Sequence, residues 1–266
     1  LSTVHNEVLD LGNLEFMQHN VVINSLTPLR SAVGHPWYSY YVLKTEGIFQ
    51  SQEEIDNFTW RDPETGIKQK VQPNAKPGDF KYVDFNNDGK ITDDDKQYLG
   101  SYMPKITFGF GGNLQWKGID FSFQFQGVGK STVYNGFKQM GYTGRGQGGN
   151  MLADVKNSWE YNKTSGVPRI GLISDPNGNY NSLNDFFLED ASYLRLKNVT
   201  IGYTLPDNVM RAIGLPGSTA RFYLNGENLF TATDYSGIDP EVGNFGIDGG
   251  TYPVARSFSI GFNFSF

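Results

Sequence analysis

Apolar and polar residues alternate strictly along the last stretch of the chain, residues 256–266. One set of alternating positions is almost wholly aromatic, consisting of Phe258, Ile260, Phe262, Phe264 and Phe266, and the positions between them hold small or polar residues. This period of two predicts a β-strand with one aromatic and one polar face. Such a strand suits a soluble sandwich, or a barrel that it crosses in about 9 to 11 residues with its aromatic face in lipid. The aromatic residue at the very end of the chain favours the barrel.

The same alternation recurs in four earlier segments, so the predicted fold is all-β. These segments are residues 106–116, 119–126, 193–203 and 219–230. The first two are separated only by Lys117-Gly118, which predicts a two-residue hairpin turn.

The connections between these segments alternate between long and short. The long stretches are 9–104, 127–190 and 234–253, whereas 205–218 and the turn at Lys117-Gly118 are short. Transmembrane barrels are built in this way, with short turns on the periplasmic side and long loops outside the cell. With the last strand ending in the periplasm, all three long connections are expected to be extracellular.

Five strands cannot close a barrel, and an open sheet edge in lipid leaves backbone groups without partners. The chain is therefore expected to be the C-terminal part of a larger barrel. The alternative is that its strands pair with another copy or another chain. The start at Leu1 without a methionine suggests a mature or partial chain.

Composition narrows the function classes. The 266 residues include 20 Phe, 15 Tyr and 32 Gly but only 38% hydrophobic residues, which suits barrel strands that are half polar. There is no cysteine, so disulfides and thiolate chemistry are excluded. A net charge of −6 gives no basic surface for nucleic acid. We find neither a signal peptide nor a run of 18 apolar residues that would predict a membrane-spanning helix.

Helical patterns are few. Residues 51–58 begin with a serine suited to an N-cap and continue with acidic residues, which predicts a short helix. A second helix is expected within 150–161 and a single turn at 209–213. The Pro-, Gly- and Lys-rich stretch 62–79 is expected to be an exposed loop.

Several segments together resemble a known family. Residues 78–127 begin GDFKYVDFNNDGKI and continue through PKITFGF to the turn WKGID. Further similar segments are 33–56, 187–206, 222–243 and the terminal YPVARSFSIGFNFSF. In this order they resemble the C-terminal portion of the SusC/RagA class of TonB-dependent outer-membrane transporters of Bacteroidota.

The resemblance implies an outer-membrane barrel of about 22 strands with an N-terminal plug domain. It implies uptake of oligosaccharides or oligopeptides with a SusD-like surface lipoprotein as a lid, energised by TonB-ExbB-ExbD through the plug. The plug and the N-terminal remainder of the barrel are expected to lie outside residues 1–266. The segment 256–266 is then the strand that closes the barrel, surrounded by outer-membrane lipid.

Residues 84–95, DFNNDGKITDDD, match the spacing of a twelve-residue calcium loop. Positions that supply oxygen ligands in such loops correspond to Asp84, Asn86, Asp88, Lys90 through its carbonyl, Thr92 and Asp95. Gly89 permits the sharp turn. Asp95 departs from the usual bidentate Glu, which weakens the match. The sequence predicts a structural calcium ion, and the alternative is an acidic turn that binds nothing.

Aromatic residues in the expected loops are candidates for substrate binding. They are Trp37, Tyr38, Tyr40, Tyr41, Tyr134 and Tyr142, with Phe137 beside them. Their rings are suited to stacking on sugars or contacting a lid. Packing of the loops onto each other is the alternative, and we favour it.

No catalytic arrangement is present. The three histidines, His5, His19 and His35, lack ligand spacing, and no carboxylate pair or nucleophile motif is marked out. Residues 144–149 fit GxGxxG but lack the strand and helix that a dinucleotide site needs, so we expect a flexible loop. The chain is not expected to be an enzyme.

Two other functions compete with nutrient import. A secreted, soluble β-sandwich binding module with a calcium loop would fold in water without detergent. A TonB-dependent siderophore receptor would share the barrel, but the segments similar to the SusC class argue against it.

Overall fold

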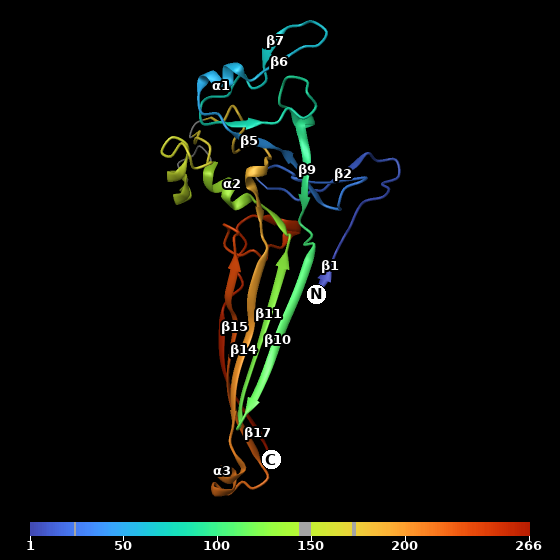
Figure 1. Cartoon of the computed structure of the whole chain (residues 1–266). Coiled ribbons are helices and arrows are strands. Elements are labelled where there is room, and N and C mark those ends of the chain that lie inside the picture. Colours follow the sequence, from blue (N-terminus) through green and yellow to red (C-terminus); the bar gives the residue numbers. More distant parts are fainter. Residues whose placement is uncertain (24, 144–149, 172–173) are drawn as a thin grey trace.

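The structure is a computed structural model that describes residues 1–23, 25–143, 150–171 and 174–266. A long antiparallel sheet forms one half of the molecule, and an assembly of loops and short elements sits at one end of it (Figure 1). The strand order in this sheet is β1-β10-β11-β14-β15-β17. Its strands are β1 (Ser2–Thr3), β10 (Ile106–Trp116), β11 (Ile119–Gly129), β14 (Tyr193–Thr204), β15 (Thr219–Thr233) and β17 (Ser257–Ser265).

The five long strands lie where the alternating segments predicted them. β10 spans the expected residues, whereas β11 runs on to Gly129 and β15 to Thr233. The alternation in β11 ends near Gly127, where the strand becomes buried, whereas β15 ends in Thr231, Ala232 and Thr233, which are largely exposed and carry no apolar pattern.

A bulge explains why the pattern in β14 holds only for its second half. The pairing of β14 with β11 shifts between Leu196 and Asn198, which lie opposite the consecutive residues Phe125 and Gln124, and this leaves Lys197 as an extra residue. Before the bulge the apolar residues have even numbers, as in Leu194 and Leu196. After it they have odd numbers, beginning with Val199. The apolar residues therefore stay on one face of the sheet throughout.

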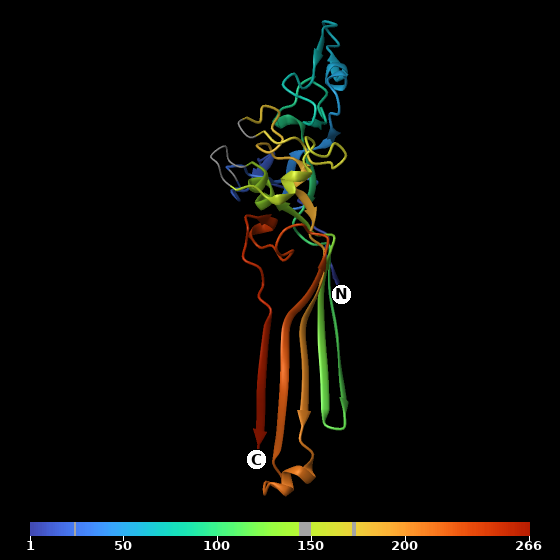
Figure 2. The same ribbon diagram turned by 90° about the vertical axis from the view of Figure 1, so that its left-hand side faces the viewer.

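The apolar face of the sheet has no second layer against it in the described residues. Ile260 is 86% exposed, Phe258 79% and Leu114 67%, although all three occupy the apolar set of alternating positions. A β-sandwich would bury these residues between two sheets. The hypothesis of a soluble β-sandwich is therefore wrong for this fold, since the sheet is a single curved layer (Figure 2).

Long and short connections lie at opposite ends of the sheet. The turn after β10 and the connection that holds helix α3 (Asp207–Ala212) are at the end away from the loop assembly (Figures 1 and 2). Lys117 and Gly118 both take positive φ values, 48° and 83°, as a tight two-residue hairpin requires.

The loop assembly contains small sheets of its own. A four-stranded sheet has the order β2 (Phe16–Gln18), β3 (Leu29–Ala32), β4 (Ser39–Leu43) and β9 (Lys96–Ser101). Two hairpin-like pairs join β5 (Thr45–Ile48) to β8 (Phe80–Tyr82) and β6 (Thr59–Arg61) to β7 (Lys68–Lys70). The expected exposed loop 62–79 thus includes strand β7. Residues 63–70 are exposed as expected, but Val71, Gln72 and Asp79 are buried at 4%, 6% and 0% exposure, so the expectation is wrong for the later part of the stretch.

A three-stranded sheet ties the long connections together. Its strands are β13 (Leu188–Asp190), β12 (Thr132–Asn135) and β16 (Ile247–Asp248). β12 and β13 come from the second long connection, and β16 comes from the third and runs parallel to β12. Strands of two to four residues have too few alternating positions to be predicted from sequence.

The helices agree only in part with their predictions. Ser51 caps α1 (Gln52–Asn57) by accepting a hydrogen bond from the Glu54 backbone N–H at 3.2 Å, as expected. The helix expected within 150–161 is wrong, because only a 3-10 turn forms at Ala153–Asn157. The chain leaves it at Ser158, and the next N–H, of Trp159, donates to the Val167 carbonyl.

The remaining helical elements are short. They are α2 (Gly136–Thr143) and 3-10 turns at Asp93–Asp95, Asp185–Phe187 and Asn244–Gly246. No helix among the described residues has the length and apolar character that crossing a membrane would require.

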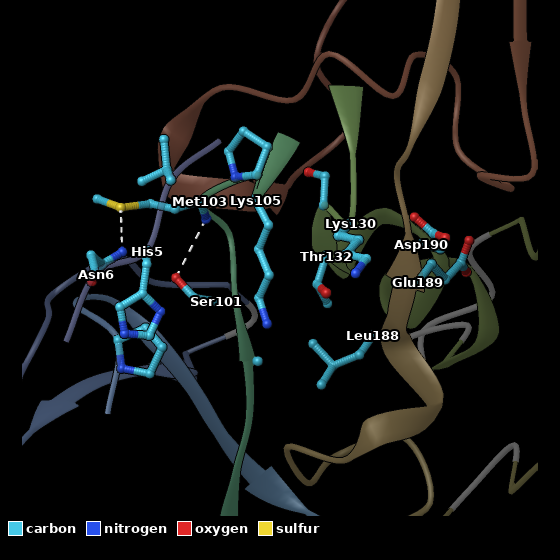
Figure 3. A pocket seen from close by; sticks show the side chains of 15 residues that line it. His5, Asn6, Ser101, Met103, Lys105, Lys130, Thr132, Leu188, Glu189 and Asp190 are labelled. Carbon is cyan, nitrogen blue, oxygen red and sulfur yellow. Dashed lines mark hydrogen bonds between the residues drawn. The ribbon is translucent and has the colours of Figure 1, made fainter. Parts of the chain in front are cut away.

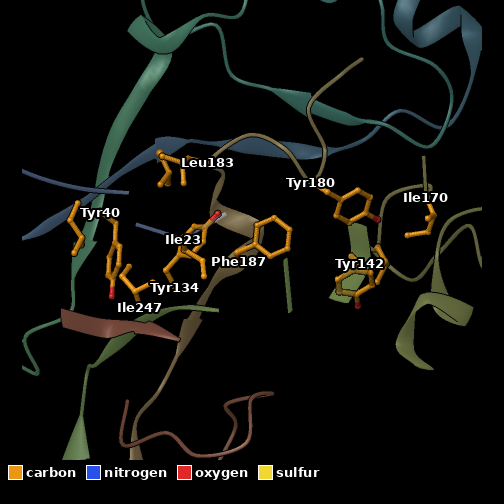
Figure 4. Packing of buried hydrophobic residues seen from close by; sticks show 12 residues of the cluster. Ile23, Tyr40, Tyr134, Tyr142, Ile170, Tyr180, Leu183, Phe187 and Ile247 are labelled. Atoms are coloured by element: carbon orange, nitrogen blue, oxygen red, sulfur yellow. The ribbon is translucent and has the colours of Figure 1, made fainter. Parts of the chain in front are cut away.

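The main hydrophobic core lies in the loop assembly. Figure 4 shows Tyr40, Tyr134, Phe187 and Ile247 meeting from four different elements. These residues come from all three long connections, so their packing holds the connections in one body. The sheet therefore has two different ends, a packed assembly at one and tight turns at the other.

The third long connection is also anchored by charge. Arg195 of β14 is 3% exposed in its side chain and lies 2.6 Å from Asp239 and 2.8 Å from Glu241. Asp239 also accepts the backbone N–H of Val254 at 3.0 Å. The connection that follows β15 is thereby fixed to the polar face of the sheet.

Candidate functional site

Three of the candidate substrate-binding aromatics are buried in the core. Tyr40, Tyr134 and Tyr142 each have 0% exposure. The Tyr40 hydroxyl lies between the carbonyls of Thr132 at 3.0 Å and Gly246 at 2.9 Å, either of which can accept its proton, and burial raises the pKa of this hydroxyl above its ordinary value. These rings hold the loops together and offer no face to a ligand.

Tyr134 and Tyr142 use their hydroxyls for internal hydrogen bonds. Tyr134 donates to Gln139 at 3.1 Å, and Tyr142 donates to Asp154. The Tyr142 hydroxyl lowers the pKa of the Asp154 carboxyl by stabilising its charged form. Tyr134 and Tyr142 therefore pack the loops onto each other, which is the alternative to ligand binding.

Trp37, Tyr38 and Tyr41 are half-buried. Trp37 and Tyr38 belong to an aromatic stack with His19. Tyr41 instead lies against Tyr98, with 4.8 Å between the ring centroids. The Tyr38 ring lies between His19 and Phe245, with centroid distances of 3.7 and 4.6 Å. The His19 Nε2 atom is hydrogen-bonded to the Ser31 hydroxyl at 2.7 Å. Burial lowers the pKa of the His19 imidazole. The exposed edges of this stack remain candidates for ligand contact.

The predicted calcium loop is closed on itself by hydrogen bonds. Asp84 accepts the backbone N–H groups of Asp88 at 3.1 Å and Gly89 at 2.9 Å. Asp95, which is fully buried, accepts the N–H groups of Phe85 at 2.8 Å and Thr92 at 2.7 Å. The first and last carboxylates of the motif thus bring the two ends of the loop together.

The remaining motif positions complete the turn. Asn86 and Asp88 accept N–H groups two residues further on, each at 3.1 Å. Lys90 lies 3.7 Å from Asp88, and the Thr92 hydroxyl accepts the Asp94 N–H at 3.2 Å. Within the described ranges, no three His, Cys, Asp or Glu side chains are grouped closely enough to hold a metal ion. The calcium ion stays a prediction.

A cavity of about 440 Å³ lies where the sheet enters the loop assembly. It is bounded by the N-terminal segment, the chain between β9 and β10, and the elements β12 and β13. Figure 3 shows the Lys105 side chain extending into the space between His5 and Thr132, with Lys130 beside Thr132.

The two lysines are neighbours across the end of a strand pair. Lys105 immediately precedes β10 and Lys130 immediately follows β11, and the N–H of Lys105 donates to the carbonyl of Lys130 at 3.3 Å. Both side chains are exposed. Neither ammonium forms an ion pair or hydrogen bond with any residue that the structure describes. Sequence reasoning missed these residues, because isolated lysines at strand ends carry no pattern.

The acidic residues that line the same cavity already have partners. Glu189 lies 2.9 Å from Lys138 and accepts the Ser236 hydroxyl at 2.8 Å. Burial alone would raise the pKa of Glu189, but the Ser236 hydrogen bonds and the Lys138 charge outweigh burial and lower it. Asp190 accepts the Ser192 N–H at 2.8 Å.

The polar face of the sheet carries one cross-strand ion pair. Arg221 of β15 donates to both carboxylate oxygens of Asp120 on β11, at 2.8 and 2.5 Å. β14 runs between these strands, and the pair crosses it at Gly202, where a Cβ would come within 2.5 Å of both side chains. A glycine inside a strand is the only feature of the sequence that points to this contact.

Known proteins are similar to the chain in sequence. It is 36% identical to TonB-dependent receptor P26 of Formosa agariphila over 280 residues, covering 100% of the chain and 26% of that protein. It is 29% identical to TonB-dependent receptor SusC of Bacteroides thetaiotaomicron, over 75% of the chain and 19% of SusC. None of the protein-family models compared with the chain matches it.

A solved structure is similar to the chain in fold. It is that of the RagAB peptide importer in the "open-open" state, with a TM-score of 0.68 and 26% identity. The similarity covers 98% of the chain and 25% of that structure's chain. The chain belongs to the SusC/RagA family of TonB-dependent receptors.

Membership of the SusC/RagA family confirms the resemblance carried by the sequence motifs. The chain spans about a quarter of the length of the relatives it matches, and it corresponds to a C-terminal portion of such a receptor. These relatives are receptors and importers, which confirms that the chain is not an enzyme. The GxGxxG stretch 144–149 lies outside the described residues.

Proposed function

We propose that the chain forms part of the barrel wall and outer loops of an outer-membrane importer that takes up oligosaccharides or oligopeptides by TonB-dependent transport. The observation that carries this proposal is the two-faced sheet. One face is apolar and exposed, and the other holds hydrogen-bonded polar groups such as Asp120 and Arg221. A barrel strand in a membrane needs this division between lipid and lumen.

The strand lengths support the same proposal. β10 and β11 have 11 residues each, β14 has 12 and β15 has 15. A strand rises about 3.3 Å per residue, so about 10 residues span about 33 Å and, at a tilt of about 40°, cross the apolar band of about 25 Å of a membrane barrel. The loop assembly would then lie outside the cell, and α3 would lie in the periplasm.

The two edges of the sheet fit a larger barrel. β1 pairs only with Ile106 and Thr107, so the rest of the outer edge of β10, opposite β11, has no partner among the described strands. The outer edge of β17 has none among them either. We propose that the remaining strands of the same receptor pair with these edges. A plug domain within that remainder would then couple uptake to TonB-ExbB-ExbD.

A SusD-like surface lipoprotein is the proposed partner on the extracellular side. The loop assembly would present a rigid surface to this lipoprotein, because one hydrophobic core joins all three long connections. The similar solved structure is that of the RagAB peptide importer, which supports oligopeptides as one class of substrate. Oligosaccharides are the other class, which the resemblance to the SusC class of transporters implies.

The test compares strains of the source bacterium that lack the receptor gene, lack TonB, or are unchanged. Each strain grows on a casein digest or on a mixture of oligosaccharides, and mass spectrometry follows which oligomers disappear from the medium. We expect the two deletions to spare the same set of oligomers. Unchanged depletion without the receptor would contradict nutrient import, and a growth defect only under iron limitation would favour a siderophore receptor.

A further inference from the structure

Building on the proposed function, we propose that the cavity at the junction of sheet and loops binds a carboxylate group of the imported oligomer through Lys105 and Lys130. The two ammonium groups are the unsatisfied charges of this cavity. Each donates three hydrogen bonds when it is fully partnered, and neither is paired with a described residue.

The acidic residues nearby cancel only part of this charge. The charge of Glu189 is neutralised by Lys138, whereas Asp190 accepts the neutral Ser192 N–H and keeps its negative charge. Lys105, Lys130 and Asp190 together leave the cavity positive, and an anion that enters it meets two ammonium groups without partners among the described residues.

The backbone holds the lysines at the cavity. Lys130 has a φ of 53°, a left-handed conformation that a lysine adopts only at a cost of about 1 kcal/mol or more. Its carbonyl accepts the Lys105 N–H, which fixes the two residues side by side. Lys105 has the same parity as Thr107 and Gly109, the polar positions of β10, so it continues the polar face upward into the loop assembly.

The neutral groups of the cavity suit a carboxylate on a polar chain. The Thr132 hydroxyl has no hydrogen-bond partner within the described part of the chain and lies beside Lys130 (Figure 3). Met103 and Leu188 supply apolar contact from opposite walls. A volume of about 440 Å³ accommodates one or two residues of an oligomer.

Two matched pairs of probes test the proposal on the purified full-length receptor with its lipoprotein. One pair is pentaalanine with a free C-terminal carboxylate and the same peptide with a C-terminal amide. The other is trigalacturonate and its methyl ester. Isothermal titration gives the affinity of each probe, and the two arms distinguish a peptide from a uronate as the source of the carboxylate.

We expect the carboxylate form in at least one pair to bind about 10-fold more tightly than its neutral form, as a charge-assisted contact predicts. Lys105→Met with Lys130→Met should reduce this preference to about twofold. Lys105→Arg with Lys130→Arg should retain it. Lys68→Met, an exposed lysine on β7, is the control for loss of charge.

Equal binding of charged and neutral probes, no binding of any probe, or a preference that survives the double methionine variant would overturn the proposal. Unchanged melting temperatures of the variants show that folding is intact. Failure of the proposed function is a separate result, because the deletion strains described above reveal it without any reference to charged probes.

Discussion

His19 is a buried side chain that makes the folding stability of the loop assembly depend on pH. Its imidazole stacks on Tyr38 and bonds to Ser31, and burial lowers its pKa. The unfolded chain therefore takes up a proton on this residue at a higher pH than the folded chain does. The stability that neutral His19 contributes is complete above its unfolded pKa of about 6.5 and is lost as pH falls below it.

We predict that the receptor melts at a lower temperature at pH 5.5 than at pH 7.5, and that His19→Gln reduces this difference. Glutamine keeps a hydrogen-bonding group for Ser31 but does not titrate. Calorimetry at the two pH values measures the effect. His35→Gln is the control, and an equal loss of pH dependence in that variant would contradict the role of His19.

The calcium loop gives a second prediction at this scale. Asp84 and Asp88 would supply carboxylate oxygens, and Ca²⁺ at 100 times its Kd would stabilise the folded loop by about 2.7 kcal/mol. Titration calorimetry of the EDTA-treated receptor should show one site fewer in Asp84→Asn than in the unchanged receptor.

Asp93→Asn is the matched control for the calcium site. Asp93 is 90% exposed and does not occupy a ligand position of the motif. If Asp84→Asn and Asp93→Asn bind the same number of calcium ions as the unchanged receptor, the loop is only an acidic turn.

At the scale of single elements, β14 depends on a glycine to accommodate its neighbours. Gly202 leaves room for the Asp120–Arg221 pair to cross the strand, and the two side chains are only 22% and 27% exposed. Partly buried, bidentate pairs of this kind are stronger than ordinary surface pairs.

We predict that Gly202→Val destabilises the receptor by about 1 to 2 kcal/mol, because the added side chain separates Asp120 from Arg221. The same substitution in an Asp120→Asn background should cost less, by a coupling energy of about 0.5 to 1 kcal/mol. Urea unfolding in detergent gives the values. Strictly additive losses would show that the glycine serves only the backbone.

The strands show how far sequence alone could predict the elements. The alternation found the five long strands because each separates an apolar from a polar environment over nine or more residues. It missed β12, β13 and β16, which have two to four residues and are formed by contacts between distant connections. The helix expected within 150–161 failed for the same reason, because tertiary contacts at Trp159 end it early.

The candidate site was less predictable than the fold. Six loop aromatics were visible in the sequence, but Tyr40, Tyr134 and Tyr142 proved to be core residues. Whether an aromatic in a loop faces a ligand or a neighbour depends on contacts between connections, which local patterns do not encode. Lys105 and Lys130 became notable only once folding placed them side by side and left them unpaired.

At the scale of the whole molecule, the two ends of the sheet differ in structure. The loop end carries the main core, the small sheets and the cavity, whereas the other end carries only α3 and a hairpin turn (Figure 1). This asymmetry fits a wall whose rigid outer end presents binding surfaces. A role as the wall of a membrane barrel requires that the apolar face of the sheet lies in lipid.

Cysteine scanning along β17 tests this claim most directly, since the chain has no cysteine of its own. Ile260→Cys and Ser259→Cys are neighbours on opposite faces, 86% exposed in the first case and also exposed in the second. Each variant of the receptor is labelled with an environment-sensitive fluorophore and reconstituted in vesicles that contain lipid-bound quenchers. We predict strong quenching at position 260 and little at 259, and equal quenching at both positions would contradict the account.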